Sequence, residues 1–419
     1  MCYFRRRISS SNKDNVSFKL ASPSTAPSKW IERGSPQFLR VTFALFSAGL
    51  ATFALLYYVQ PILPIFSKQF GISPAESSIA LSLSTVFMAL GSLFTGPLSD
   101  IVGRKSIMLI SLILASIFTL LCTIVTSWHG ILIMRAFTGL ALSGVAAVGM
   151  TYLSEEIHPY ALSFSIGLYI SGNSIGGMSG RLFVSILTDY FSWTTAVSVI
   201  SCFSFLSALI VWKLLPTSRH FRPVSLCLRK LLINFCLQWR DKALPFLFSE
   251  GFLLMGAFVT LFNYIGYRLL SAPWFLSQTL VGLISMVYLT GSWSSPKAGI
   301  MINRFGRSEV IIGGIVMMFC GLIFMLFQSL YIIFLGMILF TIGFFASHSV
   351  TSSWVGLRAR RAKGQASSLY LFSYYIGSSV SGTLGGICWY NSGWYGVSIF
   401  ISMLLILALF IGLCLKKRT

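Results

Sequence analysis

Two ionisable residues stand inside long apolar stretches of the chain, where a charge has few partners. Glu250 is the only acid well inside such a stretch, and we take Arg135 as the only base in a comparable position. A carboxyl group in apolar surroundings can gain or lose a proton as its environment changes, because burial favours the uncharged form. An arginine in the middle of a bilayer costs at least ~2.5 kcal/mol and therefore needs polar partners. These residues point to proton and charge handling in an apolar medium.

Each of these residues also has a plainer interpretation. Glu250 lies about one turn into its stretch, so its side chain can instead extend to a polar interface. Arg135 can be a structural residue bonded to backbone carbonyls. His348, between Ser347 and Ser349, is either a proton carrier or one partner of an interhelical hydrogen bond. The residue types alone leave these alternatives open.

Further polar side chains interrupt other apolar stretches. They include Asn173, Asn263 and Tyr374, and tyrosines such as Tyr57 and Tyr264 that would equally suit an interfacial aromatic belt. We expect the polar members to line a path through the protein. The predicted coupling or substrate cavity consists of Arg135, Asn173, Glu250, Asn263, His348 and Tyr374.

The composition shows which medium these residues occupy. Of the 419 residues, 55% are hydrophobic and 10% are charged, whereas a soluble domain is roughly 25% charged. The apolar runs are long and continuous, as spanning helices of about 20 residues require, and helices satisfy their own backbone polar groups in lipid. We therefore predict an all-α polytopic membrane protein with 12 transmembrane helices. They are expected near 40–62, 76–98, 106–127, 130–152, 161–187, 193–214, 246–268, 277–301, 309–328, 331–353, 366–389 and 393–415.

A long polar break divides these spans into two six-helix halves. The predicted organisation is a disordered basic tail (1–38), an N-terminal half (39–214), a linker (215–245), a C-terminal half (246–415) and a short tail (416–419). The net charge of +21 comes mostly from the tails, the linker and alternate loops, which would all lie on one side of a membrane. This bias predicts that both termini are cytoplasmic, and it explains the basic excess without a nucleic-acid partner.

The two halves share a charged motif. Gly96, Asp100, Gly103 and Arg104 recur as Gly299, Asn303, Gly306 and Arg307, each 203 residues further on. Gln60 corresponds to Asn263 at the same offset. Duplicated halves around a central cavity are the architecture of many secondary transporters.

Other sources of chemistry find no support in the sequence. The 8 cysteines form no C-x-x-C pair and the 4 histidines are spread over distant segments. There is no phosphate-binding glycine loop for ATP. We expect no metal, no cofactor and no catalytic site, so that a gradient or the substrate's own concentration difference would supply the energy.

The first copy of the charged motif, G-x-L-x-D-x-x-G-R-K, resembles the signature loop between the second and third helices of the major facilitator superfamily. The resemblance implies a conformational latch made of Gly96, Asp100, Gly103, Arg104 and Lys105. In that family the aspartate contacts the cytoplasmic end of the eleventh helix and closes the cytoplasmic side. Partners for it are available in Arg358, Arg360 and Arg361.

Two further stretches are similar to motifs of the same family. Arg135 and Gly139 resemble its fourth-helix R-x-x-x-G pattern, which implies proton or substrate handling. The run from Gly172 resembles an exporter motif in the fifth helix, although Asn173 replaces its proline. Glycines at spacings of four and five also allow close helix contact, and the predicted packing residues are Gly172, Gly176, Gly177 and Gly180.

Together these features predict a secondary transporter of a small organic solute that works by alternating access. Proton-coupled efflux is our leading interpretation, with a proton as the coupling ion. Facilitated or proton-coupled uptake of a sugar or related metabolite is the alternative, and a receptor or scaffold without transport is the third. The resemblance implies a monomer in a bacterial inner membrane, surrounded by lipid.

Overall fold

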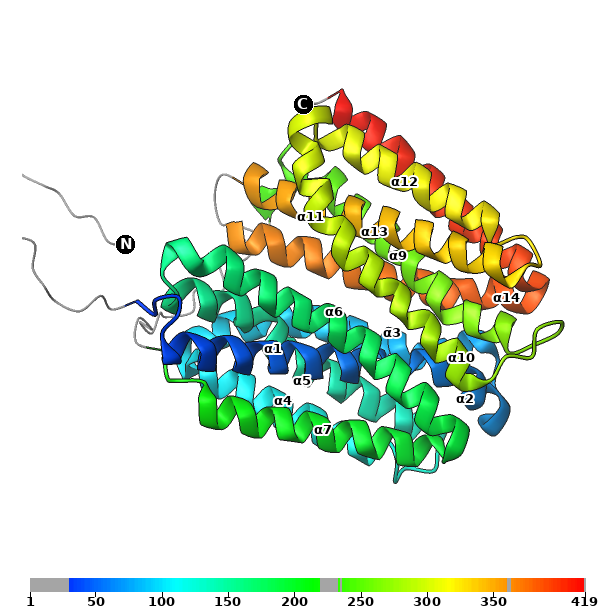
Figure 1. The fold of residues 1–419 in the computed structure, drawn as a ribbon, viewed down its shortest axis with the longest axis horizontal. Helices are drawn as coiled ribbons and strands as arrows, with labels where there is room; N and C mark the ends of the chain where they lie inside the picture. The colour runs from blue at the N-terminus through cyan, green and yellow to red at the C-terminus, as the bar shows by residue number, and fades with distance from the viewer. Residues whose placement is uncertain (1–29, 219–232, 234–235, 360–362, 418–419) are drawn as a thin grey trace, which may run out of the picture.

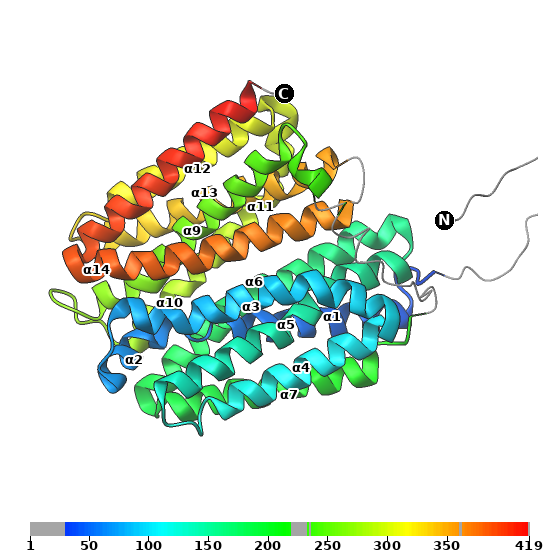
Figure 2. The ribbon, with the colours of Figure 1, turned by 180° about the vertical axis from the view of Figure 1, so that it is seen from behind.

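The computed structural model describes residues 30–218, 233, 236–359 and 363–417. In this part of the chain the regular elements are helices, accompanied by one isolated bridge between Ile31 and Ile157. The helices form two bundles that lie one above the other in Figure 1 and, seen from behind, in Figure 2. The predicted fold class, two six-helix halves, is confirmed.

The N-terminal half contains six passes, the first of which is broken. It comprises α1 (Pro36–Tyr57), η1 (Gln60–Ile62), α2 (Leu63–Phe70), α3 (Pro74–Val102), α4 (Arg104–Leu121), α5 (Trp128–Glu156), α6 (Pro159–Tyr190) and α7 (Trp193–Leu214).

The C-terminal half repeats this plan. It comprises α9 (Leu244–Leu269), α10 (Gln278–Leu283), η2 (Ile284–Val287), α11 (Tyr288–Phe305), α12 (Arg307–Phe324), α13 (Leu330–Arg358) and α14 (Lys363–Lys416). The segment α10–η2–α11 forms one pass, and α14 contains two passes that meet at Gly393, where φ is 57°. Nine described helices are long and apolar enough to cross a membrane when α14 counts once, and α6 and α10–α11 supply the other passes.

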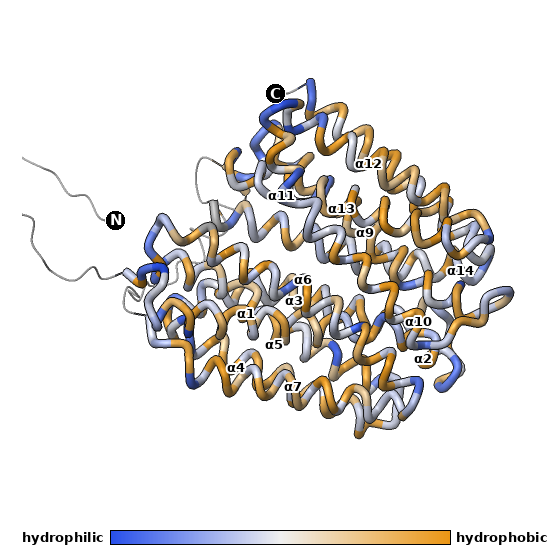
Figure 3. Tube along the Cα trace, viewed as in Figure 1, coloured by the Kyte–Doolittle hydropathy of each residue, from blue (hydrophilic) through white to orange (hydrophobic). Residues whose placement is uncertain are grey.

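Residues 30–35, the end of α7 and the end of α14 lie at one end of the bundles, which we call the linker end; the opposite end is the far end (Figure 1). The outer helices carry apolar residues along their length, and hydrophilic segments lie at both ends of the bundles, including the turn beside α2 at the far end (Figure 3). Phe94, Phe183 and Ile399 are each about 60% exposed, at 62%, 59% and 63%. Such a surface suits lipid rather than water.

The charged motif differs from the expected loop. Residues 96–102 continue α3 as helix, and only Gly103 interrupts it, with φ 101°. Gly306 does the same after α11, with φ 93°. The expectation of a loop was wrong because the helices extend beyond their apolar parts and turn sharply at one glycine, the residue that tolerates positive φ.

The N-terminal boundary also differs. α1 begins at Pro36, capped by Ser35, whose Oγ accepts from the backbone N–H of Phe38 at 3.1 Å. Ile31 donates to the carbonyl of Glu156 at 2.9 Å, so the chain before α1 is tied to the α5–α6 connection. Residues 30–38 therefore are not a disordered tail. Residues 1–29 and most of the predicted linker lie outside the described residues.

Three of the four predicted packing glycines bring α6 against α1. A Cβ on Gly172, Gly176 or Gly180 would come within 2.7 Å of backbone atoms of Phe46, Leu50 or Ala54. Gly177 points elsewhere: its nearest neighbour is the Arg181 guanidinium, 3.3 Å from a Cβ at that position. Close backbone contact therefore explains Gly172, Gly176 and Gly180, whereas Gly177 makes room for a charged side chain.

We predict that Gly176→Ala destabilises the protein, whereas Gly167→Ala on the same helix does not. The added methyl of Gly176→Ala meets the Leu50 backbone at 2.2 Å, which cannot move without shifting α1. Nothing lies within 4 Å of the Gly167 position. The overpacking should cost about 1–3 kcal/mol, measured as a lower melting temperature of the purified protein. Equal melting temperatures for the two variants would contradict the packing role.

Candidate functional site

The break in the first pass exposes polar backbone groups. α1 ends at Tyr57, and Pro61 and Pro64, which have no N–H, prevent the regular helix from continuing. The last carbonyls of a helix have no partner within it. In a bilayer such carbonyls need a donor from another part of the protein.

Arg135 on α5 supplies those donors. Its Nη1 donates to the Leu55 carbonyl at 2.9 Å, its Nη2 to the Leu56 carbonyl at 2.8 Å and its Nε to the Ala80 carbonyl of α3 at 3.0 Å. The residue is completely buried. A cation at the C-terminal end of a helix is also favoured by the helix dipole. This geometry is that of the structural alternative; a role in proton or substrate handling stays a prediction.

Arg181 on α6 is a second buried cation. Its Nε donates to Oε1 of Gln60 at 2.5 Å and its Nη1 to the Gly177 carbonyl at 2.5 Å. The rings of Tyr57 and Tyr288 lie 4.4 and 4.6 Å from its guanidinium carbon. Within the described residues no carboxylate pairs with it. Treating Arg135 as the only base inside a span was therefore wrong, although the position of Arg181 in the predicted span 161–187 already indicated it.

Arg181 begins a hydrogen-bond chain that joins the two halves. Because arginine only donates, Gln60 must turn its oxygen toward Arg181 and its amide nitrogen toward Asn263. Gln60 Nε2 accordingly donates to Oδ1 of Asn263 at 2.8 Å. The Nδ2 of Asn263 then remains a buried donor without an acceptor among the described residues. We call Arg181, Gln60, Asn263, Tyr57 and Tyr288 the Arg181 cluster.

Beyond this cluster the two halves meet at the far end. Tyr267 of α9 bonds with Ser67 at 2.7 Å and Ser77 at 2.6 Å. Asp189 of α6 accepts from the backbone N–H groups of Gln278 and Thr279, at 3.0 and 2.6 Å. Further pairs between α3 and α14 are Ser82 with Thr383 at 2.9 Å and Thr85 with Ser379 at 2.6 Å. The far end is therefore closed in this conformation.

Glu250 lies in the C-terminal half, nearer the linker end. It is completely buried, and neither carboxyl oxygen has a hydrogen-bond partner among the described residues. The interpretation that it extends to the interface does not hold in this structure. The Tyr370 ring of α14 packs against the next residue, Gly251, where an added Cβ would lie 2.6 Å from it. The Tyr370 hydroxyl is 2.8 Å from Nδ1 of His348. The His348 ring is 4.7 Å from that of Tyr374. We call Glu250, His348, Tyr370 and Tyr374 the Glu250 cluster.

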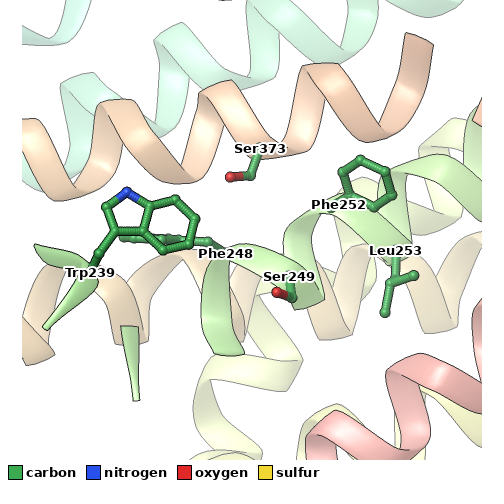
Figure 4. A pocket seen from close by; sticks show the side chains of 6 residues that line it. All are labelled: Trp239, Phe248, Ser249, Phe252, Leu253 and Ser373. Atoms are coloured by element: carbon green, nitrogen blue, oxygen red, sulfur yellow. The ribbon is translucent and has the colours of Figure 1, made fainter. Parts of the chain in front are cut away.

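A cavity of about 330 Å³ adjoins this part of α9. Figure 4 shows the hydroxyl groups of Ser249 on α9 and Ser373 on α14 among its lining, with Trp239 at one end. Ser249 directly precedes Glu250 in the chain. The remaining lining residues are Phe248, Phe252 and Leu253.

The predicted latch residues lie together at the linker end. Arg104 donates to both carboxyl oxygens of Glu155, at 2.7 and 3.1 Å, and pairs with Asp100 at 2.6 Å. Lys105 donates to the carbonyl of Trp212 at 2.8 Å. These contacts stay within the N-terminal half, and among the described residues no ion pair joins Asp100 to α14.

Of the three expected basic partners of Asp100, the structure describes one. Arg358 pairs instead with Asp241 at 3.1 Å, while Arg360 and Arg361 lie outside the described residues. Partial burial opposes the charge of Asp241, but hydrogen bonds from the backbone N–H of Ala243 and from Arg358 outweigh it and lower the pKa of that carboxyl. This pair gives α13 a fixed contact just before α9.

The six residues that the sequence predicted to line one cavity, Asn173 among them, do not form one site. Arg135 and Asn263 lie in different networks, and Glu250, His348 and Tyr374 form a third group. Asn173 faces α1, where its buried Oδ1, unpaired among described residues, lies 2.3 Å from a Cβ position on Gly49. The structure adds Arg181, Gln60, Tyr57, Tyr288 and Tyr370.

Two bundles of helices with buried charges between and within them define a membrane transporter. The model of the Major Facilitator Superfamily matches residues 41–277, and the chain belongs to that family. It is 65% identical to the inner membrane transport protein YnfM of Escherichia coli (strain K12), with 94% of each chain covered. It is 43% identical to the uncharacterized MFS-type transporter YybF of Bacillus subtilis (strain 168), over 91% of this chain and 95% of that one.

Solved structures share the fold at low sequence identity. The nucleoside transporter NupG has a TM-score of 0.73 at 16% identity, covering 90% of this chain and 99% of its own. A D-xylose-proton symporter has a TM-score of 0.68 at 14% identity, covering 89% and 97%. At such identities the likeness concerns the architecture.

The structural and the functional interpretation of Arg135 predict different results when the residue is replaced. Because three buried carbonyls lose their donors, we expect Arg135→Gln to lower the melting temperature and the yield of folded protein, at about 1–3 kcal/mol for each unsatisfied group. Arg135→Lys should lower the melting temperature less than Arg135→Gln but should not reach the wild-type value, since an ammonium group cannot reproduce the planar fork of the guanidinium group. A stable Arg135→Gln protein without transport would instead favour the functional interpretation.

The latch hypothesis predicts a change in accessibility. Asp100→Asn should favour the conformation described here, because the carboxylate would no longer be available to close the linker end. In a background without native cysteines, Ser373→Cys reports on the cavity. We expect its labelling by a thiol reagent to rise severalfold with Asp100→Asn and to stay unchanged with Asn303→Ala, the equivalent position of the second half. Equal labelling in both would remove Asp100 from the latch.

Proposed function

We propose that the chain is a proton-coupled secondary transporter that exports a small organic solute by alternating access, with Glu250 as the proton-binding group. The observation that supports this best is the complete burial of Glu250 without a partner for either oxygen among the described residues. An ionised carboxylate in such surroundings would be strongly unfavourable. The uncharged acid suits this conformation, and a change of conformation that admits water would release its proton.

The surroundings of Glu250 offer a route for that proton. The Tyr370 hydroxyl and the His348 imidazole can each accept and donate, and they are already 2.8 Å apart. The cavity lined by Ser249 and Ser373 brings polar space to the neighbouring turn of α9. Protonation and release on the linker side would then not require α9 itself to unfold.

The contacts at the far end suit a reversible gate. Between the halves they consist mainly of hydroxyl and amide groups, such as Ser67, Ser77 and Tyr267. Hydrogen bonds between neutral groups contribute about 0.5–1.5 kcal/mol each, so a modest difference in binding energy can open them. With the cytoplasmic orientation that the basic residues favour, this conformation would face the cytoplasm and be closed outside.

Uptake is the alternative direction. The D-xylose-proton symporter and the nucleoside transporter share this architecture, which serves either direction. The exporter-like glycines of α6 favour efflux, and Asn173 in place of the motif's proline weakens that argument. The direction follows from whether substrate binding accompanies or opposes protonation of Glu250.

Replacing Glu250 should separate flux from the proton gradient. In proteoliposomes containing the full chain, labelled D-xylose, uridine and 3-phenylpropanoate would be tested with and without an imposed pH gradient. For a solute that the wild type moves against its gradient, Glu250→Gln should abolish the response to pH while exchange of the solute persists. Glu309→Gln is the matched control, because Glu309 is an acid of the same half that lies at the surface and pairs with Lys416.

Two outcomes would overturn this assignment. If Glu250→Gln keeps the full pH response, the proton binds elsewhere, and His348→Gln is the next variant to test. If wild-type flux does not respond to the imposed gradient, the chain is a facilitator.

A further inference from the structure

The Arg181 cluster has more donors than acceptors. Arg181 uses Nε and Nη1 in hydrogen bonds to Gln60 and Gly177, while its Nη2 bonds to none of the described residues. Asn263 Nδ2 is also without an acceptor in the described structure, and this donor atom is buried. Arg181 is 3% exposed and Asn263 is 1% exposed. Buried donors in folded proteins are normally satisfied, so a missing acceptor is the simplest explanation.

The cluster also carries an uncompensated charge. Arg181 has no carboxylate partner among the described residues. The aromatic rings nearest to its guanidinium group are those of Tyr57 and Tyr288. Rings attract the cation but do not neutralise it. Positive charge in a bilayer-spanning protein usually marks the path or the site of a charged partner.

The position of the cluster is that of a substrate site. Arg181 and Gln60 belong to the N-terminal half, and Asn263 and Tyr288 belong to the C-terminal half. The hydrogen bonds that close the far end lie directly beyond the Arg181 cluster. A ligand that bridged Arg181 and Asn263 would contact both halves and could couple its binding to their relative movement.

We infer that the Arg181 cluster binds the carboxylate of an organic acid whose apolar or aromatic body packs against the tyrosine rings. A carboxylate only accepts hydrogen bonds and matches the planar guanidinium fork, so it supplies both the acceptors and the charge that the cluster lacks. A sugar would need hydrogen-bond acceptors as well as donors from the protein, and the cluster offers mainly donors. A cationic solute would be repelled by Arg181. This inference rests on the proposed transport function and adds the class of substrate.

The test compares solutes that share one skeleton and differ in the head group. The full chain in lipid nanodiscs would be titrated with 3-phenylpropanoate, 3-phenylpropanamide and 3-phenylpropylamine, with the melting temperature as the readout. We expect the acid to raise the melting temperature and the amide and amine to leave it unchanged. Arg181→Gln should weaken binding of the acid at least roughly tenfold, since a buried anion would lose its charged partner.

Control variants distinguish the site from the fold. Arg307→Gln removes an exposed arginine at the linker end and should bind the acid as the wild type does. If Arg181→Gln does not fold, Asn263→Asp provides the second variant: its new carboxylate can still accept from Gln60 but competes with the acid, so acid binding should be lost. Glu309→Gln, which removes an acid at the surface of the C-terminal half, should also retain acid binding.

Three results would overturn the inference. They are equal shifts with the acid and its amide, acid binding that persists in both Arg181→Gln and Asn263→Asp, and the absence of a shift with 3-phenylpropanoate in the wild type. Failure of proton coupling in proteoliposomes, with acid binding intact, would reject the proposed coupling and leave this site in place.

Discussion

The fold depends on satisfying polar groups where lipid offers no partners. The break after Tyr57 leaves carbonyls at the end of α1, and Arg135 binds two of them while also binding a carbonyl of α3. One guanidinium thus holds α1, α3 and α5 together. The buried guanidinium needs acceptors and the broken helix leaves carbonyls without donors. Their hydrogen bonds therefore reduce both the cost of burying the cation and the cost of breaking the helix. The broken pass in turn brings Gln60 to the interface between the halves.

The two halves are duplicated in backbone but differ in chemistry. Gln60 and Asn263 are related by the repeat and bond to each other across the interface, as expected near an axis that relates the halves. The cations Arg135 and Arg181 are buried in the N-terminal half, whereas Glu250 is buried and His348 half-buried in the C-terminal half. Glu156 and Arg268, at the ends of α5 and α9, are buried as well. The latch acid Asp100 is replaced by Asn303 in the second copy. In the proposed function, Arg181 of the N-terminal half provides the cation for an anion, and Glu250 of the C-terminal half provides the proton-binding acid.

Hydropathy and the repeat were sufficient to predict twelve passes and two halves, because lipid requires long apolar helices. They could not predict that residues 96–102 are helical. Hydropathy marks only the apolar part of a helix and does not show whether the polar residues beyond it continue the helix. For Arg135 the sequence could not choose between carbonyls and a cavity, because its partners Leu55 and Leu56 are backbone groups about 80 residues away. Arg181 stands in a predicted span, but its partners Gln60, Tyr57 and Tyr288 come from other passes, and its own surroundings in the sequence are glycines typical of helix packing.

The distribution of bonds also bears on how the halves can move. Within the N-terminal half, Arg104 binds Glu155 through two charged hydrogen bonds, and charge-assisted pairs are roughly twice as strong as neutral ones. Between the halves at the far end, most contacts join hydroxyl groups with one another or with a carbonyl, and Asp189 adds one charged acceptor for two backbone N–H groups. Charged bonds thus stabilise the N-terminal half, and most of the bonds that join the halves are of the weaker, neutral kind. Because movement follows the weaker set, the halves can rock as bodies around the Arg181 cluster, where a ligand in contact with both would bias the equilibrium.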